Sequence, residues 1–252
     1  MTKPIELYFW PTPNGWKISI ALEEMALPYV MKPIAIGNGD QFKPEFLSIS
    51  PNNRMPAIVD PEGPGGAPIS VFESGPILQY LGRKSGKFYP SDERARIAVD
   101  EWVAWQIANV GPMFGQASHF KNYAPNLVDD PAKIEYSVNR YNGEVGRLCG
   151  VLERRLEGRD FIVDDYSIAD IATFPWVKLL GVFGQDMSQF PNVNAWIDRI
   201  AARPAVQRGL AVGKELRRPP PAPGSAEQKE AAKALFGQTA ASVAAAIDHS
   251  KR

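Results

Sequence analysis

Short apolar runs separated by turns occupy the first third of the chain, and longer helical periodicities follow. Residues 7–10 form an apolar, aromatic run that predicts a buried strand, which ends at Pro11 and Pro13 because proline provides no ladder donor. A helix is expected next, with an apolar stripe formed by Ile18, Ala21, Leu22 and Met25. The polar residues placed off this stripe are Lys17, Glu23 and Glu24. The pattern therefore predicts a strand that turns directly into a helix at residues 11–14.

The same part of the chain continues with alternating strand and helix signals. Further strands are expected at residues 29–36, 56–60 and 68–72, with a short helical piece at 41–47. The Met55–Pro56 bond is a candidate cis peptide. Ser74 is a suitable N-cap for the helix that follows. This βαβ–ββα order is the outline of a thioredoxin-like domain ending near residue 88, and its first two strands are expected to be parallel.

From Ser91 onward the pattern is helical throughout. A helix that carries two tryptophans is expected to bend at Gly111–Pro112, and a long amphipathic helix covers residues 134–156. Ser167 and Asp170 form a Ser-x-x-Asp capping box that opens an almost wholly apolar helix at 171–182. Another helix is expected at 192–203, closed by Pro204. We therefore expect an all-helical bundle as the second domain.

The tail differs in composition from the rest of the chain. Residues 217–224 are a proline run that is expected to be extended, and 225–247 have helical composition. An appended helix packed on the body and a disordered tail are both compatible with this segment. The predicted organisation is a thioredoxin-like domain at 1–88, a helical domain at 92–216 and an extension at 217–252.

Composition narrows the class of protein further. The 28 basic residues balance 28 acidic ones, so we expect neither a nucleic-acid partner nor a membrane surface. The N-terminus lacks a signal-peptide pattern, and no apolar run is long enough to span a bilayer. A single cysteine excludes an internal disulfide and fits a reducing compartment. We therefore expect a cytoplasmic protein.

The turn at residues 11–14 is where chemistry is first expected. Thr12 and Asn14 lie at the start of a helix, where free backbone N–H groups and the positive end of the helix dipole favour an anion. Both residues are also common helix caps with no further role. No Cys-x-x-Cys motif is present, so a thiol reaction here would need the thiol to arrive with a substrate.

Four separated segments carry a resemblance to a known family. In chain order they are residues 11–15, 53–59, 72–75 and 167–170. Together they resemble the cytosolic glutathione S-transferase superfamily, and most closely its bacterial nu class and the related yeast nitrogen-regulator prion protein. The resemblance covers about residues 5–210 and excludes the tail.

The resemblance implies a homodimer that binds one or two glutathione molecules per subunit as substrate and needs no metal. The Met55 backbone before Pro56 resembles the segment that pairs with the cysteinyl backbone of glutathione. Four further residues match positions that hold the two ends of glutathione. Glu73 and Ser74 match the pair at the γ-glutamyl end, and Gln41 and Arg54 are placed to meet the glycyl end.

Arg140 and Cys149 are interpreted with their alternatives. Arg140 matches a residue that nu-class enzymes extend across the dimer to glutathione, whereas a solvated surface charge is the default for an arginine on a long helix. Cys149, far from the turn, is expected to be a buried and inert thiol. The pocket for the second substrate has only candidate wall residues, namely Phe114, Phe120, Tyr123 and Trp176.

The expected mechanism is that Thr12 Oγ and Asn14 donate hydrogen bonds to the glutathione thiolate at the helix start. Nu-class relatives are similar in reducing disulfides with two bound glutathiones, so the leading hypothesis is a disulfide reductase with weak transferase or peroxidase activity. One alternative is conjugation of glutathione to small-molecule aryl electrophiles, or removal of glutathione from aryl substrates. Another is a non-catalytic regulator or scaffold, which the intact set of Thr12, Asn14, Glu73 and Ser74 argues against.

Overall fold

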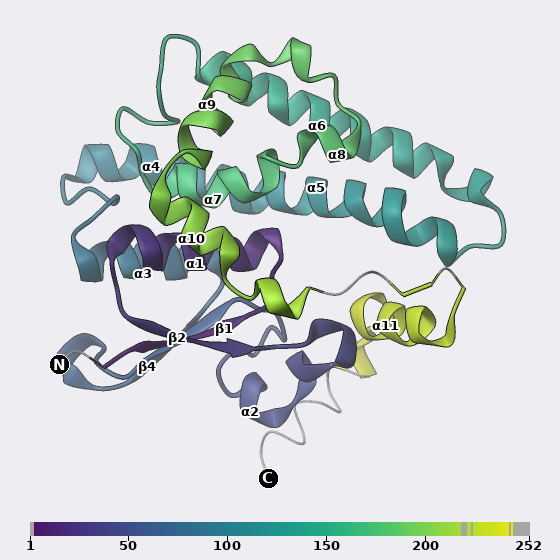
Figure 1. Ribbon diagram of the computed structural model, residues 1–252, viewed down its shortest axis with the longest axis horizontal. Helices are drawn as coiled ribbons and strands as arrows, with labels where there is room; N and C mark the ends of the chain where they lie inside the picture. Colours follow the sequence, from purple (N-terminus) through teal and green to yellow (C-terminus); the bar gives the residue numbers. More distant parts are fainter. Residues whose placement is uncertain (1–2, 218–220, 223, 242, 244–252) are drawn as a thin grey trace.

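A four-stranded mixed sheet forms the base of the N-terminal domain. The computed structural model describes residues 3–217, 221–222, 224–241 and 243. The strands are β1 (Ile5–Phe9), β2 (Tyr29–Pro33), β3 (Ala57–Asp60) and β4 (Ile69–Phe72). Their order is β2-β1-β3-β4, with β1 parallel to β2 and the other pairs antiparallel (Figure 1). The predicted thioredoxin-like domain is confirmed.

Helices cover both faces of this sheet. The helices α1 (Pro13–Met25) and α3 (Ser74–Ser85) lie between the sheet and the helical domain, and α2 (Pro44–Leu47) lies on the opposite face (Figure 1). Alternate side chains of β1 are buried, which matches the period of two in a strand. The short turns of the chain are η1 (Ile36–Asn38), η2 (Asp40–Phe42), η3 (Pro64–Gly66), η4 (Gln106–Val110), η5 (His119–Tyr123), η6 (Ala124–Asn126), η7 (Pro131–Ile134), η8 (Met187–Gln189) and η9 (Lys214–Leu216).

The second part of the chain is helical, as predicted. Its helices are α4 (Glu93–Trp105), α5 (Gly111–Ser118), α6 (Glu135–Arg155), α7 (Ile168–Val177), α8 (Leu180–Phe183), α9 (Pro191–Ala201) and α10 (Pro204–Ala211). The π-helical turn η4 joins α4 to α5 just before the expected bend. The sequence pattern missed α10 because Pro204 was interpreted as a terminator. Pro204 instead occupies the first turn of α10, where the missing N–H has no partner to lose.

α1 is the helix on which the two domains meet. It packs against α3 in its own domain and against α7 and α10 in the helical domain. Ser19 Oγ donates a hydrogen bond to the Gly209 carbonyl at 2.8 Å. A Cβ at position 209 would lie 2.6 Å from Ile20 Cα, so only glycine permits this approach. One hydrophobic core therefore runs through both domains without a break.

The predicted capping box at the start of α7 is confirmed. Ser167 Oγ accepts from the Ala169 N–H at 3.2 Å, and Asp170 accepts from the Ser167 N–H at 3.0 Å. Asp170 also accepts from the Ile162 N–H at 3.0 Å and from Trp196 Nε1 at 2.8 Å. Burial raises the pKa of Asp170 to about 6 although all these donors favour the charged form. One buried carboxylate thus ties α7 to α9 and to the loop before it.

The tail contains α11 (Ala226–Phe236), which lies within the segment expected to form an appended helix. Residues 218–220 and 223 of the proline run lie outside the described residues, as do 242 and 244–247 of the expected helix. Within the described part of the chain, no helix is long and apolar enough to cross a bilayer.

Replacing Asp170 with alanine should lower the free energy of unfolding by at least about 3 kcal/mol, because three buried N–H donors lose their acceptor at about 1–3 kcal/mol each. Urea unfolding followed by circular dichroism measures this loss. Asp198→Ala, at an exposed position on α9, is the matched control and should change stability by less than about 0.5 kcal/mol. A loss for Asp170→Ala as small as the control's would contradict a structural role for the carboxylate.

Candidate active site

A cavity of about 590 Å³ lies where the two domains meet, at the N-terminal ends of α1 and α3. Every site residue predicted from the sequence lines it except Arg140. These lining residues are Thr12, Asn14, Gln41, Arg54, Met55, Pro56, Glu73 and Ser74. The fold therefore gathers, at a single surface, residues that are up to 62 positions apart in the chain (12 to 74).

Thr12 is the N-cap of α1, as expected. Its backbone is extended (φ −123°, ψ 164°), and its Oγ1 accepts from the Gly15 N–H at 3.3 Å. The hydroxyl proton points toward Met55 Sδ, 3.9 Å from Oγ1, so the donor side of Thr12 already faces a sulfur atom. Gly15 is required because a Cβ there would lie 2.2 Å from the Trp10 carbonyl oxygen. The tight turn at residues 10–15 thus directs the Thr12 hydroxyl into the cavity.

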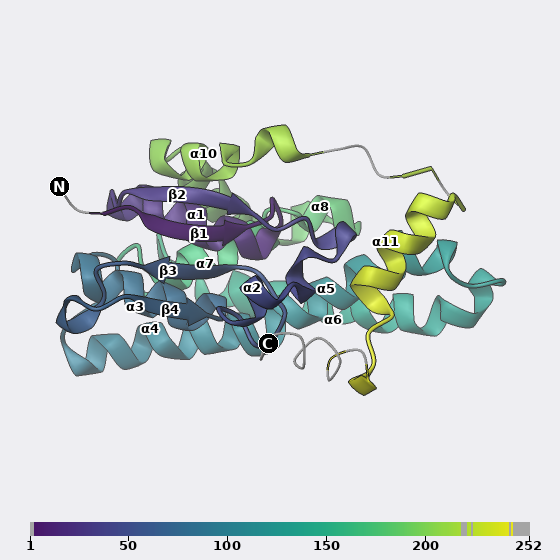
Figure 2. The same ribbon diagram turned by 90° about the horizontal axis from the view of Figure 1, so that it is seen from below.

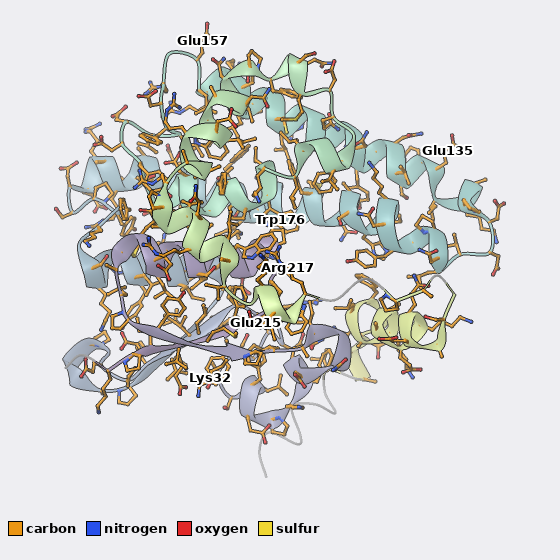
Figure 3. All side chains as sticks on the ribbon, viewed as in Figure 1. Lys32, Glu135, Glu157, Trp176, Glu215 and Arg217 are labelled. Atoms are coloured by element: carbon orange, nitrogen blue, oxygen red, sulfur yellow. The ribbon has the colours of Figure 1, made fainter. Side chains whose placement is uncertain are left out.

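Asn14 is oriented by a residue of the other domain. Trp176 Nε1 on α7 donates to Asn14 Oδ1 at 3.0 Å, and Figure 3 shows Trp176 at the junction between the helical domain and α1. With its carbonyl oxygen engaged, the side-chain amide presents its N–H₂ group as a donor. Trp176 was predicted as a pocket wall, and it does line the cavity. Its hydrogen bond to Asn14 was not predicted from the sequence.

The segment before β3 lines the next part of the cavity. The Met55–Pro56 bond is cis, as the sequence suggested. Ser50 Oγ donates to the Arg54 carbonyl at 2.8 Å and closes the loop that precedes this bond. Arg54 itself is exposed at the cavity edge. The main chain at Met55 is consequently presented to the cavity in a defined conformation.

Glu73 and Ser74 lie where β4 passes into α3. Glu73 has a positive φ of 66°, which is uncommon for a residue other than glycine. Its Oε1 accepts from Asn52 Nδ2 at 2.8 Å. The expectation that Ser74 is the N-cap is wrong, because Glu73 occupies the cap position without a side-chain bond and Ser74 is the first helical residue. The Ser74 hydroxyl instead accepts from Lys17 Nζ at 3.3 Å.

Lys17 is the main residue that the sequence pattern missed. It was placed on the polar side of α1, but it is only 2% exposed, and its Nζ donates to Gln106 Oε1 at 2.7 Å. Burial lowers the pKa of Lys17 to about 7, and the charge of Glu73 opposes that shift. The available signal was that residues 15–22 contain only two polar side chains, Lys17 and Ser19, so this stretch offers little polar surface to face water. The structure thus places a titratable amine directly behind Ser74.

Gln41 contributes a buried polar atom on the far side of the cavity. It is 1% exposed, and its Nε2 donates to the Ile36 carbonyl at 3.1 Å. Its Oε1 has no hydrogen-bond partner among the described residues. A buried carbonyl oxygen at a cavity wall fits a ligand that brings an N–H or O–H group. The amide of Gln41 is therefore a suitable anchor for a polar ligand.

Three predicted residues lie outside the cavity of this chain. Arg140 is exposed on α6 and pairs with Glu144 at 2.8 Å, so its predicted contact across a dimer stays a prediction. Phe114 and Phe120 were candidate walls, and neither lines the cavity. Phe114 is fully buried beside Trp176, and Phe120 stacks on Tyr141.

The fold and this cavity define a protein of the glutathione transferase type. The chain belongs to the glutathione S-transferase family, since the model of the family's N-terminal domain matches residues 12–84 and that of its C-terminal domain matches residues 116–204. Among relatives, the disulfide-bond oxidoreductase YfcG of Escherichia coli is 46% identical over 208 residues, covering 82% of this chain and 94% of that protein. The predicted family is confirmed.

Solved structures agree with this assignment. A glutathione transferase from Burkholderia graminis, with two glutathione molecules bound per subunit, has a TM-score of 0.78 and 47% identity. The match covers 84% of this chain and 89% of that one. A glutathione transferase from Pseudomonas putida, with one glutathione disulfide bound per subunit, has a TM-score of 0.77 and 44% identity. That match covers 83% of this chain and 91% of the other.

Above pH 7, the free energy of unfolding should rise less steeply with pH in Lys17→Met than in the natural chain. A lysine in the unfolded chain has a pKa of about 10.4, so between pH 7 and 10 the unfolded state holds more protons than the folded state. Lys17 thus raises the free energy of unfolding by up to about 1.4 kcal/mol per pH unit in this window, and the variant loses that slope. Urea unfolding at pH 7.5 and 9.5, at a fixed protein concentration, measures both slopes.

The exposed Lys229→Met is the matched control for loss of one lysine. Equal slopes for the natural chain and Lys17→Met would show that Lys17 keeps its proton in the folded state throughout this range.

Proposed function

We propose that this chain reduces small disulfides with two glutathione molecules and has weaker transferase and peroxidase activity. The proposal rests on one observation. The cavity offers hydrogen-bond donors for a thiolate, but the chain has no reactive thiol of its own. The one cysteine, Cys149, is 1% exposed on α6, and burial raises its pKa to about 12. The thiols for exchange must therefore enter with the substrate.

The start of α1 supplies enough stabilisation for a thiolate. Lowering a thiol pKa from about 8.5 to about 6.5 requires roughly 2.7 kcal/mol. A helix N-terminus contributes about 0.3–1 kcal/mol, rising to about 2 when partly buried. A hydrogen bond to a charged group adds about 1.5–3 kcal/mol. The Thr12 hydroxyl and the Asn14 amide, both at the first turn of α1, provide the donors that the helix alone would lack.

The remaining lining residues suit the rest of glutathione. In this proposal the main chain at Met55 pairs with the cysteinyl backbone next to the cis-Pro56. The Glu73 carboxylate accepts from the γ-glutamyl ammonium, and Ser74 at the start of α3 donates to its carboxylate.

The glycyl end of glutathione faces a different group of residues. Arg54 is placed at the exposed edge of the cavity for the glycyl carboxylate, and Gln41 lies beside the same end. The buried Gln41 Oε1 accepts the glycyl N–H in this arrangement. Glutathione is thus held at both ends by charged or amide groups of the cavity.

Two exchange steps complete the reaction with balanced atoms and electrons. The first glutathione thiolate attacks one sulfur of the disulfide, forms a mixed disulfide and releases one product thiolate. The second glutathione thiolate attacks the glutathione sulfur of that mixed disulfide and releases the second product thiolate. The products are glutathione disulfide and two thiols. In both steps, the hydrogen-bond donors of Thr12 and Asn14 stabilise the reacting thiolates.

The proposed assembly is a homodimer. Arg140 lies on the exposed part of α6 and does not line the cavity of its own chain, so in the proposed dimer we assign it to the glutathione of the partner subunit, as the family resemblance implies.

Conjugation to an apolar electrophile is the second candidate. The side of the cavity formed by the helical domain is mainly apolar, with Ile107, Pro112, Leu179 and Phe183. An aryl electrophile would be accommodated there beside the thiolate.

The deciding experiment compares glutathione-dependent reduction of 2-hydroxyethyl disulfide with conjugation of 1-chloro-2,4-dinitrobenzene. Rapid reduction with slow conjugation supports the proposal, and the reverse ratio supports the second candidate. If both activities are absent while calorimetry shows glutathione binding, the result favours a non-catalytic regulator or scaffold, or an enzyme with an unusual substrate.

The double variant Thr12→Ala/Asn14→Ala should lower turnover of the disulfide more than tenfold, because it removes both side-chain donors to the thiolate. The near-ultraviolet circular dichroism spectrum and the affinity for S-methylglutathione, which has no thiol, should stay close to those of the natural chain. Turnover within twofold of the natural chain would remove these two residues from the mechanism.

Cys149→Ser should leave disulfide reduction within about twofold of the natural value, since the thiol is buried and its pKa is about 12. The same coupled assay measures it. Lost activity in a variant with a native circular dichroism spectrum would show that the protein thiol takes part in exchange.

A further inference from the structure

The tail helix α11 returns to the cavity from outside the family region. The matched C-terminal domain of the family ends at residue 204, whereas α11 spans Ala226–Phe236. Figure 2 shows α11 at one end of the molecule. Leu235 and Phe236, at the end of α11, line the same cavity as Thr12 and Asn14.

On the side of the N-terminal domain, α11 packs against η1. Ala231 Cβ lies within 3.9 Å of where a Cβ at Gly37 would be, so the two backbones approach closely. Ile36, in the same turn, lines the cavity and accepts the hydrogen bond from Gln41 Nε2. α11 thus lies directly behind the turn that holds the Gln41 amide.

On the side of the helical domain, α11 ends in an aromatic cluster. The Phe236 ring lies 4.4 Å from the His119 ring at 65° and 5.2 Å from the Tyr123 ring at 59°. These distances are typical of favourable edge-to-face ring pairs. Tyr123 lines the cavity together with Phe236. The helix therefore contacts both domains beside the cavity. Of its last two side chains, which both line the cavity, Leu235 is half-buried and Phe236 is 42% exposed.

We propose that α11 is the outer wall of the co-substrate chamber and that Leu235 and Phe236 restrict its disulfide substrates to small molecules. This proposal rests on the proposed function. This part of the wall is apolar and aromatic, because Leu235, Phe236 and Tyr123 line the same cavity as the Thr12 and Asn14 donors. A disulfide within a peptide or protein would have to displace this helix to bring its sulfur to the glutathione thiolate.

The alternative is that α11 only fastens the tail to the body. A fastening role would affect stability and leave the relative rates for small and large disulfides unchanged. A wall would change that ratio and leave the binding of glutathione itself unchanged. The two roles are therefore separated by substrate selectivity and not by total activity.

The test uses the full chain with Leu235→Ala/Phe236→Ala, and Lys229→Ala on the exposed side of α11 as the matched control. The substrates are 2-hydroxyethyl disulfide and a mixed disulfide between cysteine and a ten-residue peptide. For the double variant, the ratio of kcat/KM for the peptide over kcat/KM for the small disulfide should rise at least fivefold. The control should keep the ratio of the natural chain. An unchanged ratio in a double variant that still folds would contradict the proposal that α11 forms the wall.

A binding series separates this proposal from the proposed function. If the natural chain does not reduce 2-hydroxyethyl disulfide, calorimetry with S-methylglutathione and with glutathione carrying a bulky S-linked peptide still probes the chamber. A wall predicts that the double variant gains at least fivefold in affinity for the bulky conjugate and none for S-methylglutathione. Equal gains for both ligands, or no gain, contradict the wall. Failure of the natural chain to bind any of them overturns both proposals.

Discussion

The burial of α1 on all its faces is the constraint on which this structure depends. A helix that packs on α3 within its own domain and on α7 and α10 in the other has almost no surface left for water. Its first turn is therefore fixed in position by both domains, and this first turn holds Thr12 and Asn14. The rigidity that the proposed mechanism needs at those two side chains follows from ordinary core packing.

The same burial explains the electrostatic character of the cavity. Lys17 is carried into the interior by a helix that has no exposed side, and it lies behind Ser74 with Gln106 as its second partner. The amine is buried, and its charge interacts with the exposed carboxylate of Glu73 at the cavity edge. Low solvent access strengthens the interactions of this amine with Ser74 and Gln106.

Much of this arrangement could be predicted from the sequence, because local signals and tertiary contacts agree there. The β1–α1 turn, the cis bond before Pro56 and the Ser167–Asp170 box have short-range signatures that do not depend on distant partners. Where a partner far away in the chain determines what a side chain contacts, the contact could not be predicted from the sequence. Ser74 was predicted to be the N-cap of its helix because serine is a common cap, but its hydroxyl instead accepts a hydrogen bond from Lys17 Nζ. Trp176 was identified only as a wall, since no local pattern shows that its indole N–H reaches Asn14. The placement of α11 beside the cavity also depends on contacts with segments about 100 and 200 residues away, at η5 and η1.

The contact between Ser19 and Gly209 has a consequence for how the protein is made. The first 88 residues leave the ribosome long before α10 (Pro204–Ala211) is synthesised, and until then the outer face of α1 has no cover. An apolar helix in that state exposes surface that binds other chains or chaperones. The thioredoxin-like part therefore reaches its final form only when nearly the whole body has been translated. A nascent chain that stops before residue 204 leaves the side of α1 that carries Ser19 without the helix that covers it in the finished protein.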